Sequence, residues 1–254
     1  MTDLLRQLTQ FADLSGPLFL AFMTVFLRVG AAVAMLPAFG EQAIPARVRL
    51  AIALCFALIV SPAAPPPAAV SPLLLIGEAG IGLMLGLGLR FLIFALQTAG
   101  TIIAQSISLA QLFGTMGEPQ PVIGTFLTMA ALALAVSQGL HVRAAEYLIL
   151  SYDLLPMGGG LASPDLARWG LAQVSRSFAL AFSLAAPFVI AGLLYNVALG
   201  VINRAMPQLM VAMVGAPAIT LGGIALFAIA APLMLQVWLS ALSAYLAAPL
   251  QIQP

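Results

Sequence analysis

The chain has 254 residues, of which 63% are hydrophobic and 7% are charged, and its mean hydropathy is +1.12. Soluble domains carry about 25% charged residues, so this composition excludes an ordinary water-soluble fold and indicates an integral membrane protein. The net charge of +1 provides no basic field for nucleic acid, and the single cysteine, Cys55, cannot form an internal disulfide. No polar linker divides the chain, which predicts one membrane-embedded domain over residues 1–254.

Six apolar blocks follow one another along the chain and predict helices, because backbone amides in lipid must be satisfied within their own segment. The breaks between the blocks contain the glycine and proline residues that end helices. We therefore expect an all-α fold with about six apolar helical segments, over Gly16–Phe39, Leu50–Val60, Leu73–Leu96, Val122–Leu140, Leu171–Ile202 and Ala216–Ala248.

Several features of these blocks do not suit a bundle whose helices all face lipid. Leu50–Val60 has eleven residues, about half of what a membrane span requires. Arg28, Glu78, Arg90 and Arg176 lie inside apolar blocks, where a charge costs about 2.5–3.5 kcal/mol if it faces the bilayer centre. We expect these side chains to face protein or water, and the helices to pack mainly against partner subunits or around polar interior contacts.

Five glycines lie close together in the third block, but no strand or phosphate-binding turn surrounds them. Gly82 and Gly86 form a pair of small residues four positions apart in an apolar helix, a spacing that permits close helix approach. Helix packing therefore explains these glycines better than nucleotide binding does.

A stripe of uncharged polar side chains follows the third block and covers about 140° of helical arc. It comprises Gln97, Thr98, Thr101, Gln105, Ser108 and Gln111. One interpretation is a set of hydrogen bonds between helices. The other is a surface that lines an aqueous or peptide-conducting path, because such a surface attracts water without a fixed charge.

The stripe ends at a turn that is a candidate gate loop. Gly114 and Gly117 permit backbone movement, while bulky, adaptable side chains stand beside them. The candidate gate residues are Phe113, Gly114, Met116, Gly117, Glu118 and Pro119. We expect Glu118 and Pro119 to shape the turn rather than to contact cargo.

The stretch from His141 to Arg168 is the most polar part of the chain, and we interpret it as a solvated connection. A lone histidine with no suitably spaced carboxylates does not predict a metal site. No nucleophile and base pair is apparent, so the sequence predicts neither an enzyme nor a cofactor.

The break after the fifth block contains Arg204, and residues 205–254 carry no Asp, Glu, His, Lys or Arg. A charge, two amides and a proline between apolar helices indicate a functional role, because such groups are costly in lipid. We expect assembly contacts at Arg28, Arg47, Arg49, Asn203, Arg204, Pro207 and Gln208.

Three segments together resemble the FliR family of flagellar export-gate proteins, whose counterparts occur in virulence-type secretion systems. They are Leu36–Leu50, Leu154–Gly159 and the most specific one, Asn196–Leu209, which is followed by Val214–Pro217. The resemblance extends in order and spacing over nearly the full length. The stretch Leu109–Pro119 is slightly longer than the family pattern, and Ala216 stands where a bulkier residue is usual.

The resemblance implies a core subunit of the type III export gate, in the inner membrane at the flagellar basal body. The expected partners are FliP-type and FliQ-type gate subunits, an FlhB-type switch protein, unfolded export substrates and membrane lipid. Two alternatives stay open: the equivalent subunit of a virulence-type system, or a multi-pass secondary transporter. A transporter is expected to show an internal repeat and acidic coupling residues within helices, and Glu78 is its clearest candidate acid.

Overall fold

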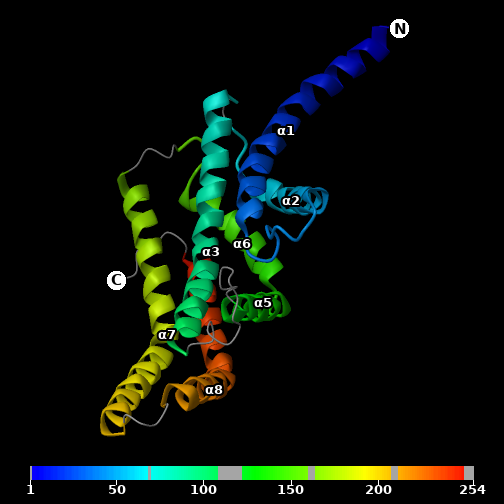
Figure 1. The fold of residues 1–254 in the computed structure, drawn as a ribbon. Coiled ribbons are helices and arrows are strands. Elements are labelled where there is room, and N and C mark those ends of the chain that lie inside the picture. Colours follow the sequence, from blue (N-terminus) through cyan, green and yellow to red (C-terminus); the bar gives the residue numbers. More distant parts are fainter. Residues whose placement is uncertain (1, 68–69, 108–121, 160–163, 207–210, 249–254) are drawn as a thin grey trace. The chain divides into compact units, whose positions relative to one another are not determined.

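A computed structural model describes residues 2–67, 70–107, 122–159, 164–206 and 211–248 (Figure 1). These residues form helices and short turns, with no strand among them, which confirms the all-α prediction. The helices are α1 (Thr2–Met35), α2 (Ala46–Val60), α3 (Pro72–Ser106), α5 (Val122–Ser137), α6 (Leu140–Leu154), α7 (Pro164–Ala205) and α8 (Val211–Ala247), and a 3-10 turn covers Ser61–Ala63.

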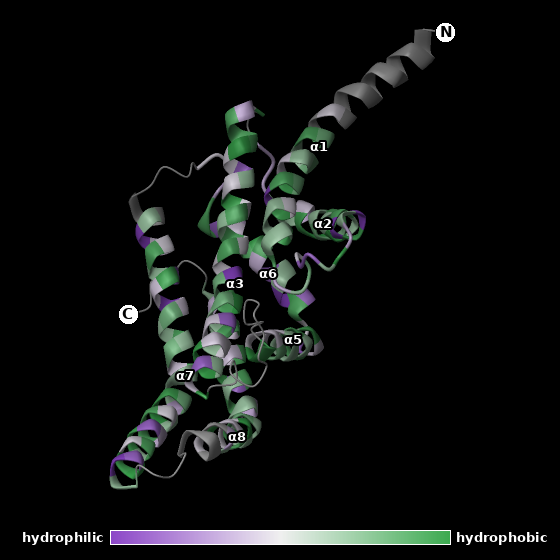
Figure 2. Cartoon of the chain, in the orientation of Figure 1, coloured by the Kyte–Doolittle hydropathy of each residue, from purple (hydrophilic) through white to green (hydrophobic). Residues whose placement is uncertain are grey.

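Five helices among the described residues are long and apolar enough to cross a membrane. These candidate spans are Leu18–Met35, Ala46–Ala63, Pro72–Ser106, Ala167–Ala205 and Pro217–Ala247. The pair α5 and α6, interrupted at Gly139 where φ is 82°, passes the same test when taken together. The prediction of about six apolar segments is confirmed, and Figure 2 shows hydrophobic residues along most of each described helix.

The second apolar block was predicted too short because the arginines before it were excluded. In the structure α2 begins at Ala46, so it includes Arg47 and Arg49, and with the 3-10 turn it offers 18 residues for a span. The third apolar block ends at Leu96, and α3 continues through the first part of the predicted polar stripe to Ser106, as the helical spacing of that stripe predicts. Polar side chains end the apolar blocks, but the helical backbone continues beneath them.

The prediction of a solvated connection over His141–Arg168 is wrong for its first half, because α6 occupies Leu140–Leu154. The helix buries Ala144, Tyr147, Leu148, Ser151 and Tyr152, which recur at intervals of three and four residues. Its charged residues lie on the other side, where Arg143 and Glu146 are exposed. This is an amphipathic helix.

The chain divides into two compact units, each built from separate stretches of sequence. The first unit contains Met1–Arg90, Gln138–Ala172 and Tyr245–Pro254, and the second contains Phe91–Ser137 and Gln173–Ala244. That the whole of 1–254 acts as one domain stays a prediction.

In the first unit, α1 packs closely against α3 because α3 presents glycine to it. A Cβ on Gly82 would clash with the backbone carbonyl of Arg28, and one on Gly86 would lie 2.6 Å from the Ala32 carbonyl oxygen. The close approach predicted from the glycine spacing is confirmed. The unit also joins α6 to α3, since the Tyr147 hydroxyl donates to the Leu85 carbonyl at 3.0 Å.

In the second unit, side chains of α7 and α8 bind two consecutive carbonyls of α3. The Ser177 hydroxyl donates to the Phe91 carbonyl at 2.7 Å, and the Trp238 indole Nε1–H donates to the Leu92 carbonyl at 2.8 Å. Such polar contacts between helices supply specificity where lipid removes the hydrophobic driving force.

The backbones of α3 and α5 touch at two glycines of the second unit. A Cβ on Gly100 would overlap the backbone of Gly124, and a Cβ on Gly124 would lie 3.1 Å from the Gln97 carbonyl oxygen. Because neither residue has a side chain, the two helices meet directly, which fixes the start of the polar stripe beside the start of α5.

Candidate functional site

The first unit encloses an ion pair between Arg28 of α1 and Glu78 of α3. Arg28 Nε donates to Glu78 Oε2 at 2.6 Å, and the two side chains are 0% and 1% exposed. Arg28 Nη1 also donates to the Ser151 carbonyl of α6 at 3.2 Å. Both mid-helix charges thus face protein, as the cost of exposing them to lipid predicts.

The other groups around this pair come from α6 and from the turn that follows it. The Arg28 guanidinium carbon lies 3.9 Å from the centroid of the Tyr152 ring, a cation–π contact. Glu78 Oε1 accepts the Gly158 backbone N–H at 3.3 Å, where Gly158 has φ of 78°. Glycine adopts this left-handed conformation at little steric cost, so the turn can present its N–H to the buried carboxylate.

This charge cluster therefore joins α1, α3, α6 and the turn after α6. Sequence reasoning identified Arg28 and Glu78 as needing partners, but it missed Ser151, Tyr152 and Gly158. The pattern that could have identified Ser151 and Tyr152 is the spacing of the apolar residues on α6, which has the period of a helix. Arg28 is buried and paired within this chain, so its surroundings give no support to the predicted role in assembly contacts.

A second, partly exposed ion pair lies in the same unit. Arg90 Nη1 of α3 donates to Glu41 Oε1 at 2.5 Å, and Glu41 belongs to the connection between α1 and α2. The pair ties this connection to α3, and solvent access to both groups makes it weaker than the buried pair.

The polar stripe lies on α3 in the second unit as far as the structure describes it. Gln97 and Thr98 are half-buried, whereas Thr101 and Gln105 are exposed. The Thr101 hydroxyl donates to the Gln97 carbonyl of its own helix at 3.0 Å, so it makes no bond to another helix there. Ser108 and Gln111 of the stripe, and the whole candidate gate Phe113–Pro119, lie outside the described residues.

The candidate assembly residues fall into different settings. Arg47, Asn203 and Arg204 are exposed, whereas Arg49 is half-buried and its Nε lacks a hydrogen-bond partner among the described residues. Pro207 and Gln208 lie outside the part of the chain that the structure describes.

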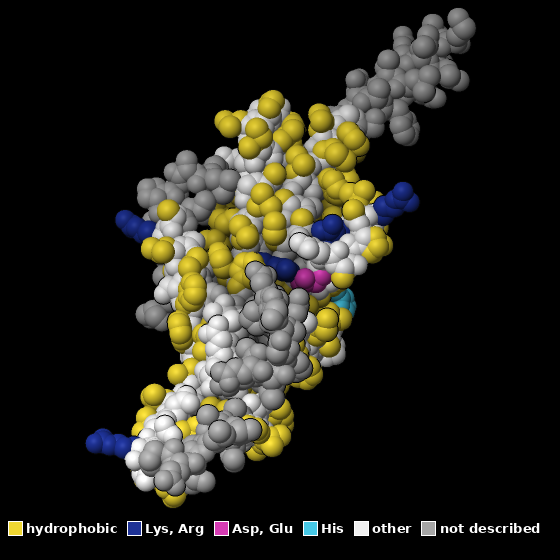
Figure 3. Space-filling view, viewed as in Figure 1, with side chains coloured by type: hydrophobic (Ala, Val, Ile, Leu, Met, Phe, Trp, Pro, Cys, Tyr) yellow, Lys and Arg dark blue, Asp and Glu magenta, His cyan; other side chains and the backbone are white. Residues whose placement is uncertain are grey.

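The last turns of α7 before Arg204 present apolar side chains that the chain itself does not cover. They are between 42% and 65% exposed, at Val189, Ile190, Leu193, Leu194, Val197, Val201 and Ile202. Figure 3 shows apolar side chains over much of the described surface, with the arginines set apart from one another. A surface of this kind is suited to lipid or to other apolar helices.

Among the described residues, no group of three or more histidine, cysteine or acidic side chains could hold a metal ion. In the charge cluster, Arg28 Nε, Arg28 Nη1 and both Glu78 oxygens are hydrogen-bonded, whereas Arg28 Nη2 and the Tyr152 hydroxyl have no partner among the described residues. The arrangement is therefore suited to holding helices together.

Residues 19–245 match the protein family described as bacterial export proteins, family 1. A relative from Caulobacter vibrioides, named flagellar biosynthetic protein FliR, is 35% identical over 224 residues, which cover 84% of this chain and 89% of that protein. Relatives with the same name from Escherichia coli K12 and Bacillus subtilis 168 are 30% and 31% identical. The matches cover 82% and 79% of this chain, and 83% and 82% of those proteins, respectively.

Proposed function

This chain belongs to the FliR family of bacterial export proteins, and from that premise we propose that it helps to form and to close the passage for unfolded export substrates. Membership makes it a membrane-embedded component of the flagellar export apparatus. We infer the part of the passage that it provides from its own residues.

The polar stripe of α3 is the observation that carries the proposal. Thr101 and Gln105 are exposed on a largely apolar helix, and neither carries a charge. A passage for many different unfolded chains needs a wettable wall without fixed charges that would hold a passing segment. The described stripe meets this requirement over two turns of helix.

The closing role is assigned to Phe113–Pro119, which follows the stripe in the sequence. Phe113 and Met116 supply bulk that adapts to different neighbours, and the glycines beside them permit movement. Together these properties suit a seal that must yield to unlike side chains.

Shortening this stretch by deleting residues 114–117 tests the closing role in cells. We expect the apparatus to assemble and the membrane to become leaky to small solutes. The matched control is Glu118→Gln, which keeps the length and should leave permeability unchanged. A shortened variant that assembles, secretes normally and shows no added permeability would mean that the stretch is a simple connector.

The exposed apolar turns of α7 support assembly with other membrane subunits, and we propose FliP-type, FliQ-type and FlhB-type proteins as these partners. Arg47, Asn203 and Arg204 are exposed beside or between apolar helices, where an unpaired guanidinium in lipid costs several kcal/mol. Partner subunits or interfacial water would relieve this cost. We place the assembly in the bacterial inner membrane.

The transporter alternative depends on a coupling acid inside a helix. Its clearest candidate, Glu78, is buried and paired with Arg28, which leaves the carboxylate little freedom to exchange a proton or ion. Deletion of the gene distinguishes the two functions: an export subunit is required for secretion of hook and filament proteins, whereas normal motility in the deletion strain would refute this role.

A further inference from the structure

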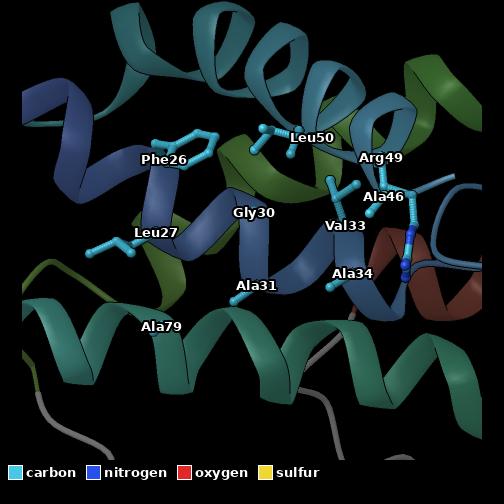
Figure 4. A pocket seen from close by; sticks show the side chains of 11 residues that line it. Phe26, Leu27, Gly30, Ala31, Val33, Ala34, Ala46, Arg49, Leu50 and Ala79 are labelled. Atoms are coloured by element: carbon cyan, nitrogen blue, oxygen red, sulfur yellow. The ribbon is translucent and has the colours of Figure 1, made fainter.

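The first unit contains an apolar cavity of about 350 Å³ between α1, α2 and the start of α3. Figure 4 shows Phe26 and Leu50 facing each other across it, with Gly30 and Ala31 on the α1 wall and Ala79 on α3. Its volume falls within the range of about 300–1,000 Å³ that is usual for small-molecule sites. The function proposed above does not use this cavity.

Arg49 is the one charged residue among those that line the cavity, and no acidic side chain lines it. Figure 4 shows its side chain reaching from α2 along the cavity beside Val33 and Ala34. The Nε of Arg49 is buried and has no hydrogen-bond partner among the described residues. A buried guanidinium N–H without an acceptor is costly, so the cavity favours an occupant whose anionic oxygen can accept a hydrogen bond from Arg49 Nε.

The two ends of the cavity differ in polarity along the helix axes. Ala34 and Ala46 adjoin the connection between α1 and α2, and Arg49 lies less than one turn inside α2. Phe26 lies eight residues before Ala34, about 12 Å deeper at 1.5 Å per residue. The charged end is therefore near the end of two candidate spans, where lipid headgroups lie, and the apolar end points into the spans.

We propose that this cavity binds an anionic phospholipid, with its phosphate at Arg49 and part of an acyl chain between Phe26 and Leu50. A partner helix is a poorer fit, because a helix with its side chains is about 10–12 Å across, whereas an acyl chain is much thinner. The bound phosphate satisfies the guanidinium with charge-assisted hydrogen bonds. The arginine near the start of α2 thus has a partner without leaving the membrane.

The test titrates the purified full chain in detergent with phosphatidylglycerol and, separately, with phosphatidylcholine of the same acyl chains, and counts bound lipid by native mass spectrometry. We expect wild type to prefer phosphatidylglycerol. Arg49→Gln should weaken its binding at least tenfold and abolish the preference, because the charge-assisted bonds are lost.

Two matched controls separate a site from general attraction of lipid. Arg47→Gln removes the same charge two residues away but does not line the cavity, and it should change binding less than twofold. Gly30→Leu fills the cavity wall, where only Phe26 at 4.0 Å is near a new Cβ, and should weaken binding about tenfold. Gly77→Leu, with nothing within 4 Å, should not. Equal losses in the Arg47 and Arg49 variants would overturn the proposal.

The occupant in cells is identified by a photo-crosslinking residue at Leu50, which is 60% exposed and lines the cavity. A phospholipid adduct on the full-length chain, lost in the Arg49→Gln background, supports the proposal. Adducts to polypeptide alone would overturn it in favour of a partner subunit, and they would leave the proposed export role untouched.

Discussion

The buried pair of Arg28 and Glu78 gives the most demanding prediction, because both charges are shielded from solvent. Removing one partner leaves the other as an uncompensated buried charge, which costs about 3–5 kcal/mol. Arg28→Met also gives up the bond to the Ser151 carbonyl and the contact with the Tyr152 ring. We therefore expect Arg28→Met and Glu78→Leu each to destabilise the chain by about 3–5 kcal/mol.

The double variant should be far less affected than the sum of the two single changes. With both charges absent, the interior loses an attraction but no longer contains an unpaired ion, so a total cost of about 2 kcal/mol or less is expected. The coupling between the two sites should then exceed about 3 kcal/mol, well above the deviation of about 0.5 kcal/mol that independent sites show.

The measurement is equilibrium unfolding of the full chain in mixed micelles, followed by the fluorescence of its two tryptophans. Glu146→Gln is the matched control, since it removes an exposed charge from α6 and should stay within about 0.5 kcal/mol of wild type. Single variants that cost less than about 1 kcal/mol would refute the conclusion that the two buried charges compensate each other. A double variant whose cost equals the sum of the two single costs would refute it as well.

Three further changes test the packing and the assembly. Gly86→Leu should destabilise the first unit by about 1–3 kcal/mol or more, because even a Cβ lies within contact of the α1 backbone, while Gly77→Leu, which meets nothing within 4 Å, should be near neutral in the same unfolding assay. Trp238→Phe should cost about 1 kcal/mol by losing the bond to the Leu92 carbonyl, and an unchanged unfolding free energy would contradict that bond. Arg204→Ala should reduce the yield of intact complex recovered by affinity purification while the isolated chain stays folded; wild-type complex and motility would count against an assembly role.

Sequence reasoning succeeded where a local pattern determines the structure. Apolar length and the glycine and proline breaks predicted the candidate spans, and the spacing of Gly82 and Gly86 predicted a close helix contact. It failed at α6, where the polar side chains of His141, Arg143, Glu146 and Asp153 were interpreted as a solvated connection. The buried residues Ala144, Tyr147, Leu148 and Ser151 repeat with the period of a helix, so the pattern was present but was masked by composition.

The charge cluster could be predicted only in part, for a different reason. The cost of a charge in lipid implies that Arg28 and Glu78 have partners, but 50 positions separate them and their pairing depends on how α1 and α3 pack. The N–H of Gly158 becomes a partner only because its backbone adopts a left-handed conformation. No property of the local sequence identifies that donor.

The direct contact of Gly100 with Gly124 has a consequence for how this protein can change over evolution. It holds the α3 and α5 backbones together near the end of one helix and the start of the other, so the sequence that connects them has a fixed base. Closing a loop on a fixed base costs only about 0.6 kcal/mol more for each doubling of its length. Insertions and deletions in the connection between α3 and α5 should therefore leave the glycine contact intact at little cost to the fold.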